Sequence, residues 1–282
     1  MKDAHIHYMP GPADPPKEFL RKTALAGVDG GTIFSMPPAS FRHDPENSQH
    51  WRERLEFILE YTADTPGFHP FLWIDPTEAD AVEQINTAAA AGIHGFKCIC
   101  NHFYPATQLD KFRLIAETGL PLHFHSGILY DHYASSEFNR PIAFECLIGV
   151  KNLKFALAHV GWPWCDEYIA LYGKLNDAQI SVLHDLNLRM YADLTPGTPG
   201  IYRREVLRKL YCMKHYRVDS FVIWGSDSQV NDYNYKDVLE LLERDRRIMD
   251  EIVVEYGKTD IYRKATEFNI ESFYAFSKTA DN

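Results

Sequence analysis

The stretch DAHIHYMPGP, residues 3–12, distinguishes between two folds that the chain could adopt. Its first half predicts a β-strand. Side chains two apart on a strand point to the same face, so His5 and His7 can bind one ion. Its second half is a turn with two prolines. A doubly wound open sheet needs free N–H groups for phosphate in the turn after its first strand, and proline has none. The stretch therefore favours a closed barrel.

The rest of the chain alternates strand-like and helix-like segments, the pattern of βα units and a parallel sheet. Eight strands are predicted, at residues 2–8, 31–36, 68–74, 94–100, 120–126, 154–160, 190–195 and 221–226. Helices are predicted at 16–26, 49–64, 108–118, 137–150, 176–187 and 200–213, with one more from an N-cap at Asp75 to Gly92. Two further helices, 235–256 and 261–277, follow the last strand. We predict an α/β fold: one (β/α)8 TIM-barrel domain over 1–282 with a C-terminal helical extension.

Composition limits the possible partners. The chain has 282 residues, 45% of them hydrophobic, and a formal net charge of −10, which argues against a nucleic-acid or anionic-membrane partner. No run of 18 apolar residues occurs, and the start, MKDAHIHYMP, is not a signal peptide. The five cysteines have no framework spacing, which indicates reduced thiols. We expect a soluble cytoplasmic protein that acts on a small molecule, with no nucleic acid and no membrane as partner.

Polar side chains stand at the ends of the predicted strands. Besides His5 and His7 they are Lys97, His123, His125, His159 and Asp227. In a barrel the carboxyl ends of the strands converge on one face, so residues distant in sequence meet there. Imidazole nitrogens with a carboxylate are the ligand set of catalytic zinc and related divalent ions. The sequence therefore predicts a metal site at this face.

Several motifs occur in the order of the strands. They are Asp3-Ala-His5-Ile-His7, Gly95-Phe96-Lys97, the segment LPLHFHSG at 120–127, Ala158-His159-Val160-Gly161, Trp224-Gly225-Ser226-Asp227, and the segment around Asn269. Together they resemble the amidohydrolase superfamily, in particular its amidohydrolase-2 branch of metal-dependent hydrolases with a TIM-barrel fold. The resemblance extends over nearly the whole chain.

The resemblance implies roles for these residues. His5 and His7 would bind a divalent ion, zinc in our prediction, with Asp227 as a further ligand and His125 as another. A metal-bound hydroxide would attack an ester, lactone or amide carbonyl, and Asp227 would take a proton from the metal-bound water. His159 would be a ligand of a second metal or a catalytic hydrogen-bond donor. The catalytic residues are thus Asp227 and His159, and we expect a homo-oligomer, as in relatives.

Lys97 determines the metal count. In binuclear relatives a lysine at this position is carboxylated and bridges two ions, so the site would hold two. An unmodified Lys97 would pair with Asp227 or with an anionic group of the substrate, and the site would hold one ion. We favour one ion and keep both alternatives. His123 is expected one layer deeper than His125, and Asp3, two residues before His5, could orient a histidine through its second ring nitrogen.

The loops at the expected mouth are aromatic. Tyr130 and Trp162 predict an apolar or ring-binding pocket, although packing under long loops is an equal alternative. Arg140 could anchor a carboxylate or form an exposed salt bridge. These features also suit a second function, since the same branch contains metal-dependent non-oxidative decarboxylases of aromatic or unsaturated acids. A barrel that binds metal or ligand without turnover is the remaining alternative.

Overall fold

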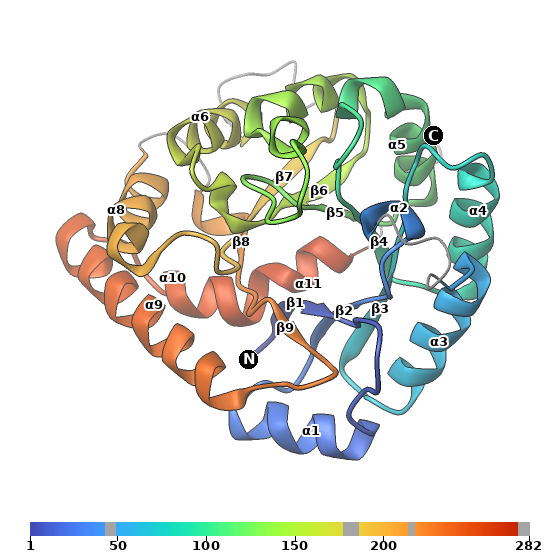
Figure 1. Ribbon diagram of the computed structural model, residues 1–282. Coiled ribbons are helices and arrows are strands. Elements are labelled where there is room, and N and C mark those ends of the chain that lie inside the picture. Colours follow the sequence, from blue (N-terminus) through green and yellow to red (C-terminus); the bar gives the residue numbers. More distant parts are fainter. Residues whose placement is uncertain (43–48, 177–185, 214–217, 276–282) are drawn as a thin grey trace, which may run out of the picture.

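A single curled sheet forms the centre of the protein. The computed structural model describes residues 1–42, 49–176, 186–213 and 218–275. Within them, nine strands follow the order β8-β7-β6-β5-β4-β3-β2-β1-β9, and all neighbours are parallel (Figure 1). The strands are β1 (Asp3–His7), β2 (Gly31–Phe34), β3 (Phe68–Trp73), β4 (Gly95–Cys98), β5 (Leu122–Phe124), β6 (Lys154–Leu157), β7 (Arg189–Asp193), β8 (Val222–Ile223) and β9 (Ser228–Gln229).

The two edges of the sheet meet through one continuous segment of chain. β8 pairs with β7, whereas β9, only five residues farther on, pairs with β1. Between them the Ala4 amide donates to the Trp224 carbonyl at 2.9 Å, and the Asp227 amide donates to the His5 carbonyl at 3.0 Å. The sheet is therefore closed, and β8 with β9 occupies the eighth strand position of a (β/α)8 TIM barrel. The predicted fold is confirmed, and each predicted strand overlaps an observed one, with β7 beginning at Arg189, one residue before its predicted start.

Helices surround the sheet (Figure 1). The α-helices are α1 (Pro16–Leu25), α2 (Ala39–Arg42), α3 (Trp51–Ala63), α4 (Ala81–Ala91), α5 (Leu109–Thr118), α6 (Cys165–Asn176), α8 (Gly200–Tyr211), α9 (Tyr235–Tyr256), α10 (Ile261–Arg263) and α11 (Asn269–Tyr274). A π-helical turn, η6 (Lys264–Phe268), joins α10 to α11. The 3-10 helices are η1 (Pro105–Gln108), η2 (Ser136–Asn139), η3 (Pro141–Gly149), η4 (His159–Gly161) and η5 (Val218–Ser220). Most of the helix predicted at 176–187 lies outside the described residues.

Two helix predictions were wrong in detail. The segment 137–150 is not one α-helix but the 3-10 helices η2 and η3, separated at Arg140, which is extended because a proline follows it. Asp75 is not an N-cap. Its carboxylate accepts hydrogen bonds from the amide and the hydroxyl of Thr77, so it closes a local turn, and α4 begins only at Ala81.

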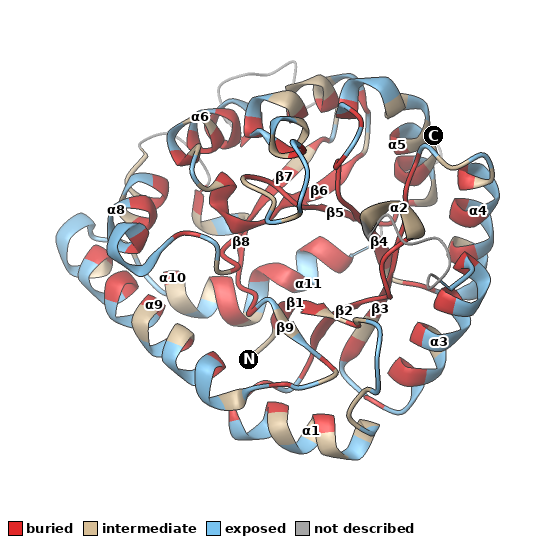
Figure 2. Ribbon diagram, in the orientation of Figure 1, coloured by how far each residue is buried: buried red, intermediate tan, exposed pale blue. Residues whose placement is uncertain are grey.

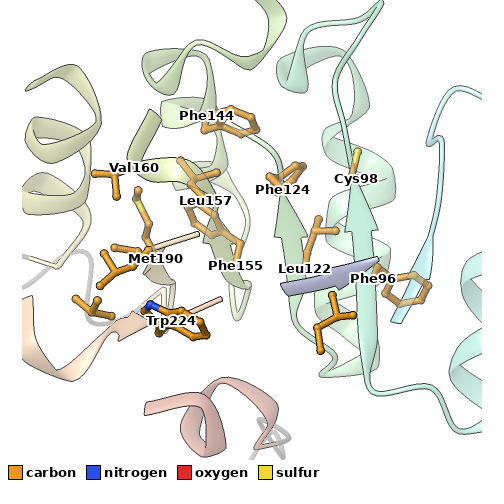
Figure 3. Close-up of a cluster of buried hydrophobic side chains, with 14 of the residues drawn as sticks. Phe96, Cys98, Leu122, Phe124, Phe144, Phe155, Leu157, Val160, Met190 and Trp224 are labelled. Carbon is orange, nitrogen blue, oxygen red and sulfur yellow. The ribbon is translucent and has the colours of Figure 1, made fainter. Parts of the chain in front are cut away.

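The core has two layers, one on each side of the sheet. Outward side chains of the strands, such as Phe96, Phe124 and Leu157, belong to one buried cluster (Figure 3), and the strands of the sheet are coloured mostly as buried in Figure 2. Inside the barrel, Phe34, Phe71 and other buried residues pack against α11, which crosses the centre of the ring in Figure 1. The C-terminal extension therefore closes the amino end of the barrel, and only the carboxyl end can hold an open site.

Candidate active site at the carboxyl ends of the strands

A cavity of about 290 Å³ opens at the carboxyl ends of the strands. It is lined by His5, His7, Met9, Phe41, Trp73, Lys97, Ile99, His125, Ile128, Leu129, Tyr130, His159, Trp162, Pro196, Gly197, Asp227 and Gln229. The residues that the sequence singled out for the site line this cavity, with the exception of Arg140, His123 and Asp3. The barrel thus brings together side chains from both ends of the chain.

Three ligand atoms converge at the floor of the cavity. The Nε2 atoms of His5 and His7 lie 3.0 Å apart. Asp227 Oδ1 is 3.4 Å from the first and 3.2 Å from the second. Burial, first of all, lowers the pKa of His5 well below its ordinary value and also lowers that of His7, so both rings are neutral and can offer lone pairs. The floor is therefore rich in electron-pair donors.

The spacing of these atoms fits a bound cation. Atoms that bind a tetrahedral ion at about 2.0–2.2 Å lie roughly 3.3–3.6 Å from one another. The three separations of 3.0, 3.2 and 3.4 Å are close to that range. His159 belongs to the same region, since its ring, that of His5 and the Asp227 carboxylate have ligand atoms within 4.8 Å of one another. The residues present therefore fit a divalent ion.

The other ring nitrogen of His5 binds a buried carboxylate. His5 Nδ1 lies 2.7 Å from Asp193 Oδ2, and His123 Nε2 lies 2.8 Å from the same oxygen. The Thr195 amide donates to Asp193 Oδ1 at 2.9 Å. Burial acts to raise the pKa of Asp193, but the hydrogen bonds from His123 and His5 outweigh it and hold that pKa well below its usual range. An ionised Asp193 thus accepts the His5 Nδ1–H and leaves the lone pair on Nε2.

Asp193 was missed by the sequence interpretation, which had placed Asp3 in this position. Asp3 instead accepts hydrogen bonds from the amides of His5 and Ser226 and from the Tyr233 hydroxyl. The cause is an irregularity in β1. Asp3 pairs with Gly31 but Ile6 pairs with Ile33, so three steps along β1 match two along β2. The regular alternation of faces is lost between these residues, and Asp3 does not lie under His5.

His159 and Asp227 share an unusual backbone conformation. Their φ angles are +63° and +62°, and Val160 follows with +46°. Such left-handed values are strained for residues other than glycine and often accompany functional sites. His159 Nδ1 donates to the Pro196 carbonyl at 2.7 Å, so in the neutral ring Nε2 carries the lone pair. Both side chains are thereby aimed at the floor of the cavity from the ends of β6 and β8.

Two glycines let the backbone approach the histidines closely. A Cβ atom at Gly225 would lie 2.4 Å from the Cβ of His5, and one at Gly197 would lie 2.7 Å from the Cβ of His159. Neither distance is sterically possible, so any larger residue would displace the neighbouring histidine. The glycine of the Trp224-Gly225-Ser226-Asp227 motif is thus explained by the packing of His5.

Lys97 is fully buried beside the three ligand atoms. Its Nζ is 3.3 Å from His5 Nε2 and 4.6 Å from the centre of the Phe34 ring. Burial lowers its pKa to about 8. Among the described residues no carboxylate oxygen lies within 4.0 Å of Nζ, so the pairing with Asp227 expected for an unmodified Lys97 is not seen.

His125 lines the cavity beside His159. Its Nε2 donates to the Ile128 carbonyl at 3.2 Å. Its ring centre is 4.7 Å from that of His159. The groups His5, His159, Asp227 and His5, His123, Asp193 have ligand atoms within 4.8 Å of one another, and they include neither His125 nor His7. The role of His125 as a ligand stays a prediction.

Comparison with known proteins identifies the family. The family model described as amidohydrolase matches residues 3–210. The chain belongs to the amidohydrolase family.

No curated protein matches the sequence. Among solved structures, a dihydroorotase from Campylobacter jejuni is similar with a TM-score of 0.55 at 14% identity, covering 98% of this chain and 84% of that one. A dihydrodipicolinate synthase from Agrobacterium tumefaciens aligns with a TM-score of 0.48 at 15% identity, covering 88% and 77% of the two chains.

Membership agrees with the site described above. The amidohydrolase family is typically metal-dependent, and His5, His159 and Asp227 form a candidate metal-binding group. At 14% identity the likeness to dihydroorotase shows the barrel fold alone. Within the part of the chain that the structure describes, no helix has the length and apolarity needed to cross a membrane.

The predicted substrate-binding residues of this amidohydrolase differ in their positions. Trp162 lines the cavity, with its ring stacked on Tyr202 at 5.0 Å, and Tyr130 stands at the mouth with 85% of its surface exposed. Arg140 does not line the cavity. Its Nε donates to Glu167 at 2.9 Å, half exposed, which is the salt bridge that the sequence allowed as the alternative.

Proposed function

We propose that this amidohydrolase is a metal-dependent hydrolase that cleaves an ester, lactone or amide of a small molecule with an activated water. The observation that carries the proposal is the triangle of His5 Nε2, His7 Nε2 and Asp227 Oδ1, with sides of 3.0, 3.2 and 3.4 Å. Two imidazoles and a carboxylate with further positions open to solvent are the donor set of catalytic zinc. A zinc ion there would acidify a water toward a pKa of about 7 and polarise a carbonyl oxygen.

The protein's own residues then have distinct tasks. Asp193 holds the Nδ1–H of His5, which keeps the Nε2 lone pair directed at the floor. Asp227, with 39% of its side chain exposed, accepts the proton of the attacking water and passes it to the leaving group. His159 Nε2 is a ligand while Nδ1–H donates to the Pro196 carbonyl, and it would donate to the carbonyl oxygen of a substrate only when the ring carries a second proton. Lys97 adds positive charge beside the same point and offsets the charge that develops there.

A second observation supports water as the nucleophile. No serine, threonine or cysteine is present among the described lining residues. Covalent catalysis through a hydroxyl or a thiol would need such a side chain near the floor. Direct attack by water, with Asp227 as base, needs none. We propose a single ion, because His125 Nε2 donates to the Ile128 carbonyl and Lys97 contacts His5 Nε2 at 3.3 Å.

The alternative function is metal-dependent decarboxylation of an aromatic or unsaturated acid. Its support is the aromatic wall of the cavity and Lys97, which could hold a carboxylate at the floor. It has less support than hydrolysis because Arg140, the expected carboxylate anchor, is outside the cavity. The two functions differ in their products, carbon dioxide against the two halves of a cleaved carbonyl compound.

Metal removal and product analysis test the proposal. Protein treated with a chelator should lose turnover of aryl esters, lactones or anilides, and zinc at one equivalent should restore it. His7→Ala should lower the bound metal measured by elemental analysis, whereas His94→Gln, at the opposite end of β4, should leave it unchanged. Full activity without metal would refute the proposal. Release of carbon dioxide from aryl acids, with no carbonyl cleavage, would establish the alternative.

A further inference from the structure

The charged groups of the cavity are confined to its floor. Apart from histidines, only two of the described lining residues have side chains that carry a charge near neutral pH, Lys97 and Asp227, and their charges are opposite. Lys97 Nζ is 3.3 Å and Asp227 Oδ1 is 3.4 Å from the same atom, His5 Nε2. The two charged side chains among the described lining residues therefore lie at one point.

The walls above that point are largely apolar, and their polar members among the described residues, such as Gln229, Tyr130 and His125, offer no charged partner. Trp73, Trp162 and Phe41 supply aromatic surface, and the aliphatic side chains include Ile99 and Leu129. An ionised group held against these walls would lose its hydration without gaining a partner, which is unfavourable. An uncharged ring would bury apolar surface there and gain free energy.

Two arginines whose side chains the structure describes lie near these walls, and both have partners outside the cavity. Arg54 lies behind Trp73, and its Nη1 donates to the carbonyls of Trp73 and Met36 at 2.6 and 3.0 Å. Arg140 pairs with Glu167 outside the cavity. Neither guanidinium lines the cavity, so neither can anchor an anionic group at the far end of a substrate.

We infer that the site takes a substrate whose body is a single uncharged ring and whose reacting polar group lies at one end; this rests on the proposed function. The volume agrees, because a cavity of about 150 Å³ holds benzene. The cavity of about 290 Å³ has room for one ring and its reacting group. Substrates with a second, ionised group remote from the reacting one are excluded by the same walls.

A matched set of esters tests the charge selectivity. Phenyl acetate, 4-methylphenyl acetate and 4-acetoxybenzoate share one reacting ester and differ at the opposite end of the ring. With zinc-loaded protein, kcat/KM should be similar for the first two and about 100-fold lower for the carboxylate, which must be buried without a partner. Equal or faster turnover of 4-acetoxybenzoate would overturn the inference.

A binding measurement separates this inference from the proposed function. Trp73 and Trp162 line the cavity, so ligand binding can be followed by tryptophan fluorescence without turnover. Benzamide should bind more tightly than 4-carbamoylbenzoate. If no ester is hydrolysed but this order holds, hydrolysis is wrong and the substrate class stands. If both bind equally, or the carboxylate binds better, the substrate class is wrong whatever the reaction.

Two tryptophans two residues apart provide the variant and its control. Trp162 lines the cavity, whereas Trp164 does not and lies 5.5 Å from the Arg140 guanidinium. Trp162→Ala should weaken benzamide binding about tenfold because the ring loses an aromatic contact, and Trp164→Ala should leave it within twofold. An equal loss in both variants, or none in Trp162→Ala, would contradict the role of this wall. The ester series on the unmodified protein remains decisive should a variant fail to fold.

Discussion

The two ring nitrogens of His5 face two clusters of the same residue types with different spacing. On the Nε2 side, a histidine and Asp227 stand 3.0 and 3.4 Å away, and Asp227 is partly open to the cavity. On the Nδ1 side, Asp193 lies at 2.7 Å from His5 and 2.8 Å from His123, and all three are fully buried. The distance of 3.4 Å from His5 Nε2 to Asp227 is longer than a hydrogen bond of about 2.7–3.2 Å and matches the separation of two ligands of one ion, whereas the 3.0 Å to His7 and both Nδ1-side distances fall within the hydrogen-bond range.

This difference shows that the inner cluster prepares the outer one. A neutral imidazole carries one N–H proton, and the hydrogen bond to Asp193 keeps this proton on Nδ1 of His5. The outer nitrogen is then available to a metal in every molecule of the population. Exposure to the cavity thus separates the two clusters better than composition does, because His7 and Asp227 are partly exposed whereas His123 and Asp193 are fully buried.

The sharpest test of the outer cluster is Asp227→Asn. The amide keeps the shape but cannot accept the proton of the attacking water, so kcat should fall by about 10²–10⁴-fold. The histidines remain, so much of the metal should stay bound, measured as metal per protein after gel filtration. Activity within tenfold of the unmodified enzyme would show that Asp227 is not the base.

The inner cluster is tested by Asp193→Asn. The amide can offer an N–H to the histidines in place of an acceptor, which disturbs the tautomer of His5. Zinc affinity, measured by competition with a chromophoric chelator, should fall about 10–100-fold. Asp3→Asn is the matched control, because Asp3 is equally buried but contacts only the main chain of His5. Equal losses in both variants would mean that general destabilisation, and not ring orientation, is responsible.

The smallest effect is expected at the opposite end of the barrel. There the His69 ring lies 4.3 Å from that of His94 and 4.6 Å from that of Tyr274 in α11. Burial, with smaller contributions from His94 and Lys2, lowers the pKa of His69 from 6.5 to about 4. Between these values the unfolded chain binds more protons, so stability is fully present above pH 6.5 and falls as the pH drops toward 4.

His69→Gln should therefore flatten the dependence of Tm on pH in this window. Both proteins are compared from pH 4 to 7 with the metal site loaded, so that the histidines at the mouth contribute equally. His132→Gln, an exposed loop position, serves as control. An unchanged slope in His69→Gln would show that the pair at this end is not the source of the pH dependence.

The sequence was sufficient for the fold because the relevant signals are local. Strand and helix periodicity located all eight strand positions, and the prolines at 10 and 12 excluded the open sheet. Local signals also led to two wrong helix predictions. Asp75 has the residue type of an N-cap but binds Thr77, and Pro141 breaks a predicted α-helix into 3-10 turns.

The site was predictable where a motif names its residues, and less so where contacts are non-local. His5, His7, Lys97, His159 and Asp227 line one cavity, as the order of the strands predicted. Asp193 was missed because its partners are 188 and 70 residues away in the chain. Asp3 was assigned in its place because regular alternation was assumed across an irregular strand. For Arg140, sequence could not separate substrate binding from the salt bridge with Glu167.

The left-handed backbone at Asp227 has a consequence for protein engineering. Glycine adopts a φ of +62° without strain, so Asp227→Gly should relax the chain at this point. If variants were selected for heat resistance without a requirement for activity, Asp227→Gly would be enriched, although it removes the proposed catalytic base. Variants selected for stability should therefore be assayed for activity in every round, because stability favours glycine at position 227 whereas the proposed catalysis requires aspartate.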